Sequence, residues 1–239
     1  MKQETRIGTA GWNIPQQSRN DFAHQGSQLE RYASRFSAVE INSSFYRSHK
    51  RSTYQRWALA VPADFRFAVK LPKEITHKRK LVDCTQPLDQ FFEESGGLGG
   101  KLGPILVQLP PSLAFDAAVA TIFLEAIRSR FGGQIACEPR HPSWFDDQAD
   151  GLSVQWRIAR VVADPSPVPR ALSPGGWPDF AYFRLHGSPK LYYSPYSEPQ
   201  LDTWVRAMTS TKAQANWCIF DNTASGEASG NALALMARL

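Results

Sequence analysis

Charged and amide side chains stand at the ends of short apolar runs in this 239-residue chain. They could do two kinds of chemistry, since carboxylates, imidazole and lysine transfer protons while arginine and lysine bind anions. The shared end of a set of parallel strands would bring them together. The residues at the run ends are Glu40, Asn42, Lys70, Gln108, Glu138, Asp164, Arg184, His186, Asp221 and Asn222.

Eight runs of this kind predict a TIM (β/α)8 barrel, an α/β fold, in a single domain over residues 1–239. Amphipathic or loop-like segments separate the runs, and no Gly/Ser linker or charge block divides the chain. The runs cover residues 7–12, 39–42, 65–70, 105–108, 135–138, 160–164, 180–186 and 217–222. The strands are expected to begin near residues 7, 39, 65, 105, 135, 160, 180 and 216.

Apolar residues at helical spacing predict helices between several of the strands. Ser27 and Glu30 have the pattern of a capping box, Asp116 can cap the helix that follows it, and residues 231–239 should form the closing helix. The prolines between residues 165 and 178 exclude a regular helix. We therefore expect an irregular, extended loop in place of the helix between strands six and seven.

Alternation along each strand predicts which side chains face the barrel interior. Turning the polar residue inward leaves aliphatic or aromatic residues for the helix side. The same choice makes Cys137 a packed structural thiol. The inward groups are Glu40 with Asn42, Lys70 with Ala68, Glu138 with Ala136, Asp164 with Val162, and Arg184 with His186 and Tyr182.

Glu138 and His141 are the leading acid–base candidates, and Lys70 and Asp164 are further catalytic candidates. An inward glutamate would be partly desolvated, which raises its pKa toward the range of a general acid or base. The alternative is a glutamate that pairs with a neighbouring arginine and has no catalytic duty. For His141, which precedes a proline, the alternative is a capping or surface role.

Cations in the same set predict a site for an anionic substrate. Arginine presents a planar fork suited to phosphate or carboxylate, and Arg184 is expected to make such a contact. Lys70 could instead form a Schiff base if burial lowers its pKa, and internal salt bridges are the alternative for all of these cations. The predicted substrate-binding residues are Glu40, Asn42, His77, Gln108, Arg140, Arg184, His186, Tyr196, Asp221 and Asn222.

Two basic segments, residues 47–51 and 77–80, follow strands two and three and should lie on the same face of the barrel. The formal net charge of +5 favours anionic partners, either a small substrate or nucleic acid. A solvated charged surface is the alternative. The loop around Tyr192 and Tyr196 offers the best candidates for stacking on a base or a sugar.

No motif indicates a cofactor or a resident metal, and we predict neither. P-loop, G-x-G-x-x-G and H-E-x-x-H patterns are absent. The histidines and strand-end carboxylates could in principle bind a metal, which keeps a metal-dependent endonuclease as an alternative. A glycosidase is disfavoured because it needs two carboxyl groups around the bond, whereas strands four and seven offer Gln108, Arg184 and His186.

The location of the protein is predicted to be cytoplasmic. Its apolar runs are far shorter than the ~18 residues that a membrane span needs, and no apolar leader precedes the first strand. The three cysteines show no C-x-x-C pattern, which fits a reducing compartment. We expect no membrane partner.

The motifs resemble those of the YecE-like family, also called domain of unknown function 72. The resemblance runs from Gly8 to Leu235 and implies a TIM-barrel fold, but it supplies no reaction, because no activity is established for the family. The segments that carry it are GTAGW, VEINSSFYR, FAVKLPKEITH, ILVQLPPSLAFD, CEPRHPSWF, YFRLHG and FDNTASGEASGNALAL.

Three segments depart from the family pattern. The family more often has Glu-Phe-Arg-His at residues 138–141, often has Asn-Asn at residues 221–222, and commonly has a Trp-Gly-Phe-Tyr-Pro stretch that residues 13–26 lack. The last departure affects the expected shape of one pocket wall.

These observations predict a hydrolase-like enzyme that acts on a phosphorylated or otherwise anionic substrate at the C-terminal mouth of the barrel. Glu138 would be its acid or base. The alternative is a non-catalytic protein that binds nucleic acid or a nucleotide. Catalysis predicts a strongly perturbed Glu138 in a closed pocket, whereas binding alone predicts an open basic groove.

Overall fold

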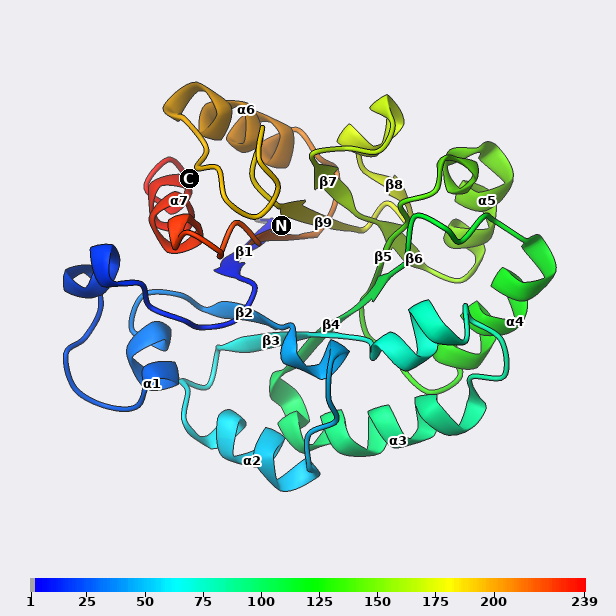
Figure 1. Cartoon of the computed structure of the whole chain (residues 1–239), viewed down its shortest axis with the longest axis horizontal. Helices are drawn as coiled ribbons and strands as arrows, with labels where there is room; N and C mark the ends of the chain where they lie inside the picture. Colours follow the sequence, from blue (N-terminus) through cyan, green and yellow to red (C-terminus); the bar gives the residue numbers. More distant parts are fainter. Residues whose placement is uncertain (1–2) are drawn as a thin grey trace.

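A computed structural model describes residues 3–239 as an α/β fold in which helices surround parallel strands (Figure 1). The predicted runs all form strands, and the largest differences in starting position are at Glu4 and Leu102. The strands are β1 Glu4–Thr9, β2 Ala38–Ile41, β3 Arg66–Lys70, β4 Leu102–Gln108, β5 Ile135–Glu138, β6 Ile158–Arg160, β7 Val162–Asp164, β8 Gly175–Gly176, β9 Phe180–Leu185 and β10 Ala215–Phe220.

Within residues 3–239 the strands form two hydrogen-bonded sheets, with the orders β1-β10-β9-β7 and β2-β3-β4-β5-β6-β8. The structure does not confirm the single closed sheet that a (β/α)8 barrel requires. The sixth predicted strand is split at Val161, because β6 pairs with β5 while β7 pairs with β9. An isolated bridge between Ala10 and Glu40 joins the other two edges.

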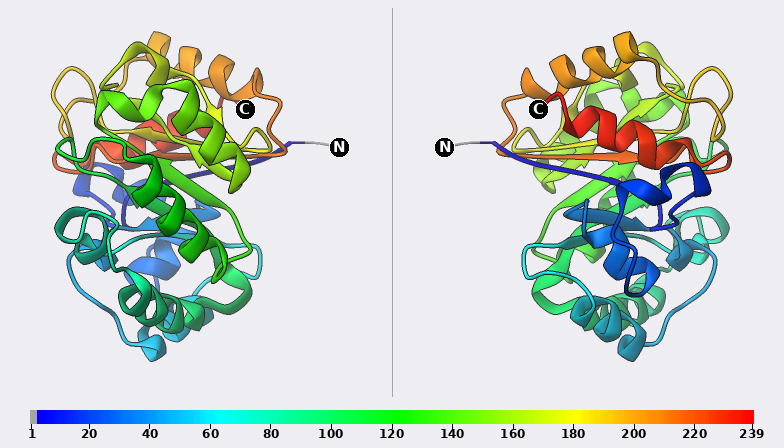
Figure 2. Two further views of the ribbon diagram at one scale, coloured as in Figure 1. Left: turned by 90° about the vertical axis from the view of Figure 1, so that its right-hand side faces the viewer. Right: turned by 90° about the vertical axis from the view of Figure 1, so that its left-hand side faces the viewer.

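The helices lie outside the strands, as the two turned views show (Figure 2). The capping box of Ser27 and Glu30 and the cap at Asp116 are both confirmed. The last helix starts at Glu227, earlier than predicted. The α-helices are α1 Gln28–Ala33, α2 Arg51–Leu59, α3 Thr85–Ser95, α4 Ala117–Arg128, α5 Asp147–Gln155, α6 Glu198–Thr209 and α7 Glu227–Met236.

The proline-rich segment between β7 and β9 contains no α-helix in the structure, as predicted. It forms one short 3-10 turn, Pro169–Leu172, and the two-residue strand β8, which runs antiparallel to β6. Among residues 3–239, moreover, no helix is both long and apolar enough to cross a membrane.

Two apolar layers show which way the strands face. The interior layer contains Ala68 and Ala136 from one sheet and Tyr182 from the other, so the inner faces of the two sheets share one core. The outer layer, against the helices, contains Cys137 and Phe183. The predicted inward registers of β3, β5 and β9 are therefore confirmed, and so is the packed position of Cys137.

The register predicted for Asp164 is wrong. Val162 packs in the outer layer, whereas Val161 and Ala163 pack in the interior. Because side chains alternate along a strand, Asp164 follows Val162 to the helix side. A prediction from the polar residue alone had chosen the opposite face.

Candidate active site

Arg184 is the centre of a buried ionic network that joins the two sheets. Arg184 lies near the end of β9 and is fully buried. It donates from Nη2 to Glu40 Oε1 at 2.6 Å and from Nη1 to Glu138 Oε2 at 3.0 Å. Its Nη2 also lies 3.1 Å from Asp221 Oδ2, and Tyr182 donates to the other oxygen of Glu40. One guanidinium therefore links the C-terminal ends of β2, β5, β9 and β10.

The role predicted for Arg184 needs correction. Each of its three nitrogens donates to a carboxylate of the protein, including Nε, which lies 2.9 Å from Glu40 Oε2. A guanidinium engaged in this way cannot also form a bidentate contact with a substrate. The internal salt bridge, the alternative weighed for this residue, is what the structure contains.

Glu138 collects donors on its other oxygen. Oε1 accepts from Gln108 Nε2 at 3.1 Å, from Arg140 Nη2 at 2.9 Å and from His186 Nε2 at 3.0 Å. Burial alone would raise the pKa of Glu138, but the cations of Arg184, His186 and Arg140 outweigh burial and hold that pKa well below its usual value. The predicted upward shift is therefore wrong, and Glu138 is a carboxylate at neutral pH.

His186 lies between two carboxylates. Its Nε2 is 3.0 Å from Glu138 Oε1 and its Nδ1 is 3.0 Å from Asp221 Oδ2. Burial works against the charged ring, yet the contacts with Glu138 and Asp221 prevail and raise the pKa of His186. Asp221 responds in the opposite direction, since Arg184 and His186 overcome its burial and lower its pKa.

This geometry predicts the pH dependence of stability. A pKa raised by folding stabilises the protein below the unfolded value, near 6.5, and this contribution is lost as pH rises through the folded pKa. The free energy of unfolding should therefore fall above pH ~6.5 more steeply in the wild type than in a His186→Gln variant. The difference between the two proteins isolates His186, because Lys70, whose pKa is lowered to about 8, acts in the opposite direction above that pH in both. Parallel curves would contradict the prediction.

Lys70 joins the same interior without a carboxylate partner. Its Nζ lies 4.1 Å from the centroid of the Phe45 ring, and among residues 3–239 no carboxylate lies within ion-pair distance of it. Burial, followed by the charge of Arg184, lowers the pKa of Lys70 to about 8. Asn42 follows Ile41, which ends β2 and pairs with Val69, the residue before Lys70. Asn42 Oδ1 is buried without a partner in the described residues.

A cleft of about 340 Å³ opens this network to solvent, and we call it the mouth cleft. Arg140 is the most exposed member of the network that lines it, with 23% of its side chain accessible. The lining also includes Pro139, Ala163 and Leu191 together with Glu138, His186, Pro111 and residues 165–167. Of the seven residues predicted to converge on one pocket, Glu40, Glu138, Arg184, His186 and Asp221 form one buried network that Lys70 adjoins, and Glu138 and His186 line the mouth cleft. Asp164 does not join them, whereas Gln108 and Arg140 bond to Glu138.

Several predicted site residues have structural partners elsewhere. The Asp164 carboxylate accepts from the hydroxyl of Tyr196, which is buried, so the expected exposed stacking role of Tyr196 is wrong. His141 caps the 3-10 turn Pro142–Phe145 through Nδ1, which is the alternative considered for it. Asn222 donates to the backbone oxygen of Ser194 and to Asn231 in α7, so it joins a loop to that helix.

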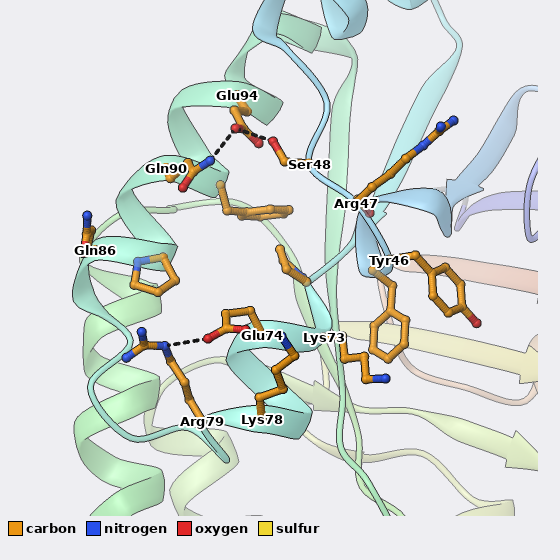
Figure 3. A pocket seen from close by; sticks show the side chains of 15 residues that line it. Tyr46, Arg47, Ser48, Lys73, Glu74, Lys78, Arg79, Gln86, Gln90 and Glu94 are labelled. Carbon is orange, nitrogen blue, oxygen red and sulfur yellow. Dashed lines mark hydrogen bonds and ion pairs between the residues drawn. The ribbon is translucent and has the colours of Figure 1, made fainter.

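The basic segments meet at a second cleft of about 450 Å³, which we call the side cleft (Figure 3). In Figure 3, Tyr46 and Arg47 lie across this cleft from Gln86 and Gln90. Neither segment lines the mouth cleft, contrary to the prediction that the basic loops share it. The lining residues that carry charge are Arg47, Lys73, Glu74, Lys78, Arg79 and Glu94.

His77 connects the two regions. Its ring packs edge-on against Phe45 with centroids 4.9 Å apart, and its Nδ1 lies 2.9 Å from Thr76 Oγ1. Burial, then the charges of Lys70, Lys73 and Arg140, lower the pKa of His77. Phe45, which ends the 3-10 turn Ser43–Phe45 after β2, is therefore a site residue. The sequence marks it as an aromatic near a strand end, but its contact with Lys70 was not predicted.

No group of three or more His, Cys, Asp or Glu side chains within residues 3–239 is placed to hold a metal ion. The carboxylates of the network are arranged around Arg184 instead, and a guanidinium at the centre opposes a dication electrostatically.

The arrangement of parallel strands with surrounding helices is also found in solved structures that include a xylose isomerase-like TIM barrel. A xylose isomerase-like TIM barrel/4-hydroxyphenylpyruvate dioxygenase fusion protein superposes with a TM-score of 0.53 at 14% identity, over 96% of this chain and 41% of that one. SacUVDE superposes with a TM-score of 0.57 at 9% identity, over 99% of this chain and 98% of that one. These likenesses show the fold alone.

The chain belongs to the family described as "Protein of unknown function DUF72", whose model matches residues 6–239. UPF0759 protein YecE of Escherichia coli K12 is 29% identical over 68% of this chain, and the match spans 60% of that relative's length. A DUF72 protein of Thermotoga maritima superposes with a TM-score of 0.80 at 24% identity, covering 98% of each chain. The resemblance inferred from the motifs is confirmed.

Proposed function

We propose that this protein is an enzyme that acts on a phosphorylated or otherwise anionic substrate in the mouth cleft. The observation that carries the proposal is the position of Arg140 and His186 on the wall of that cleft, at the ends of β5 and β9. The nearest nitrogens of the two side chains are 3.4 Å apart, and both point at Glu138 Oε1. An anionic oxygen that enters beside Glu138 would meet both cations.

Charge balance supports the same proposal. Three buried carboxylates, those of Glu40, Glu138 and Asp221, face four cationic groups. With His186 and Lys70 protonated, the network has one surplus positive charge, which a bound anion would neutralise. Such a surplus in a partly desolvated cleft attracts anions more strongly than an exposed basic surface does. The four cationic groups are Lys70, Arg140, Arg184 and His186.

Hydrolysis, in particular of a phosphoester, is the reaction that we propose. His186 holds a proton at Nε2 that a substrate oxygen could receive if it replaced Glu138 as the partner of that nitrogen. Glu138 stays ionised, so its role is that of a base or an orienting carboxylate and not that of an acid. Asp221 keeps the imidazole oriented through Nδ1.

Arg140→Ala is expected to weaken the binding of inorganic phosphate or pyrophosphate about 10- to 100-fold, because a hydrogen bond to a charged group contributes ~1.5–3 kcal/mol. Isothermal titration calorimetry at two salt concentrations measures the affinity of the wild type and the variant for each anion. Arg170→Ala is the matched control, since Arg170 pairs with Asp147 and Asp150 at the surface and should leave binding unchanged. Equal affinity in the wild type and Arg140→Ala would refute the proposal.

Nucleic-acid or nucleotide binding without catalysis is the second candidate. It is favoured by Tyr46, which is 78% exposed, beside Arg47 at the rim of the side cleft. Proteins bind single-stranded nucleic acids through stacking on aromatic rings and contacts with phosphates, and this binding weakens steeply as the salt concentration rises. Titration of single-stranded DNA and RNA into Tyr46→Ala and the wild type at low and moderate salt tests it. Unchanged binding in Tyr46→Ala would oppose it.

A cytoplasmic location remains part of the proposal. It is supported by the three cysteines, which are all free and buried. A metal-dependent endonuclease would require the network to rearrange around Arg184, and we do not propose it.

A further inference from the structure

Lys70 is a buried amine that the hydrolytic scheme leaves unused. It ends β3 on the inward register, and only 5% of the residue is accessible. A buried lysine ordinarily has a paired carboxylate, because an unpaired ammonium is costly to desolvate. Lys70 has the aromatic ring of Phe45 in that place within the described chain. The backbone carbonyl of Lys70 is fixed by the hydroxyl of Ser44, so the strand end is anchored.

Charged groups from several strands act on this amine, and the charge of Arg184 opposes its protonation. Burial and Arg184 lower the pKa of Lys70 to about 8, against the attraction of three carboxylates. In roughly a tenth of the molecules, the Lys70 amine is therefore uncharged at pH 7. The groups are Arg184 on β9, Glu40 on β2, Glu138 on β5, Asp221 after β10 and His77 after β3.

We propose that Lys70 is a nucleophile that forms an imine with a small aldehyde or ketone carrying a carboxylate or phosphate group. A buried amine that has no ion-pair partner in the described residues, and that is uncharged in part of the molecules at neutral pH, can add to a carbonyl group. Asn42 Oδ1, which is buried without a partner in the described residues and follows the strand paired with β3, offers an acceptor for the hydroxyl group that the addition creates. The anionic part of this inference rests on the proposed function through Arg140, which lines the mouth cleft and whose charge also acts on His77.

The step balances with groups already in place. The amine attacks the carbonyl carbon, a C–N bond forms, and the carbonyl electrons move to oxygen. His77, which packs on the same Phe45 ring as the amine and whose pKa is lowered, can take the surplus proton from nitrogen and deliver it to that oxygen. Water then leaves as the nitrogen lone pair forms the C=N bond, so one carbonyl and one amine give one imine and one water.

Phe45 indicates how a substrate would approach the amine, and His77 indicates where its anionic group would bind. Phe45 contacts the amine and also lines the side cleft, which can hold a small molecule. His77 lies among the charges of Lys70, Lys73 and Arg140. A carboxylate or phosphate next to His77 would be held by these cations while its carbonyl group reaches Lys70.

Reductive trapping tests the proposal on the intact protein. Pyruvate, glyceraldehyde 3-phosphate and the neutral aldehyde propanal are each added with sodium borohydride, and the modified lysine is located by peptide mass spectrometry. We expect one adduct at Lys70, at least tenfold more with an anionic compound than with propanal. The pyruvate and phosphate arms show which anion is preferred. Trapping should increase with pH around a midpoint near 8.

Lys70→Arg should abolish the adduct. Lys212→Arg is the matched control, since Lys212 is exposed in the segment between α6 and β10 and should leave trapping unchanged. Peptide mapping of the wild type decides the matter even if Lys70→Arg does not fold. Adducts spread over the exposed lysines, or none at Lys70, would overturn the proposal.

The outcomes separate this inference from the proposed function. Phosphate that binds through Arg140, with no adduct at Lys70, would leave the proposed function intact and refute the imine. An adduct formed equally with propanal would refute the anionic substrate class.

Discussion

Replacing Arg184 with methionine is expected to destabilise the protein by about 3–5 kcal/mol, as removal of one partner from a buried ion pair does. Methionine fills much of the same volume but leaves Glu40, Glu138 and Asp221 without the guanidinium that they surround. Neutralising these buried carboxylates would require protonation, so the variant should also be most stable at a lower pH than the wild type. Urea unfolding at several pH values measures both effects.

Arg170→Met provides the control for that experiment. Arg170 also pairs with two aspartates, but it lies at the surface, where ion pairs contribute little. A small effect of Arg184→Met, similar to that of the control, would show that the carboxylates do not depend on Arg184. The two sheets would then be held together chiefly by their shared apolar core.

The strand positions and most inward faces could be predicted because alternation is a local property. At Lys70 and Glu138, the polar residue and the alanine two positions earlier agree, so one register satisfies both. At Asp164 the signal fails. The chain passes from one sheet to the other at Val161, and nothing in the residues 160–164 marks that change of partner.

The roles of individual site residues depended on contacts between distant segments. Arg184 is a strand-end arginine in the sequence, and only its surroundings decide whether it faces a substrate or three carboxylates of the protein. The pKa of Glu138 shifts in the direction opposite to the prediction for the same reason. Its burial could be inferred from the sequence pattern, but the three cations around it could not.

For His141 and Tyr196, the neighbouring residues in the sequence indicate a structural role better than the residue type alone does. His141 is followed by Pro142 and Ser143, a sequence typical of a residue that caps a short turn. Tyr196 precedes a serine–glutamate–proline helix start, where a large apolar residue often packs against the helix. Both signals favour structural roles, which is what the structure contains.

Glu138→Gln is expected to separate the structural role of the network from its anion binding. Glutamine keeps the size of the side chain but removes one negative charge, so His186 loses a partner that raises its pKa. The pKa of His186, followed by NMR titration, should therefore be lower in the variant than in the wild type. Glu74→Gln is the matched control, because Glu74 pairs with Lys78 and Arg79 beside the side cleft and should leave His186 unchanged.

Phosphate binding gives the second measurement on the same variant. Loss of one carboxylate leaves Arg140 without its main partner, which frees its guanidinium for a ligand. Removal of the negative charge should add ~1.4 kcal/mol or more of attraction at the mouth cleft, so phosphate should bind about tenfold more tightly at a pH below the His186 pKa of the variant. Weaker binding of phosphate there would mean that Glu138 supports the anion site through its geometry. The mouth cleft would then need an intact Glu138 to hold Arg140 in position, and charge surplus would not explain its preference for anions.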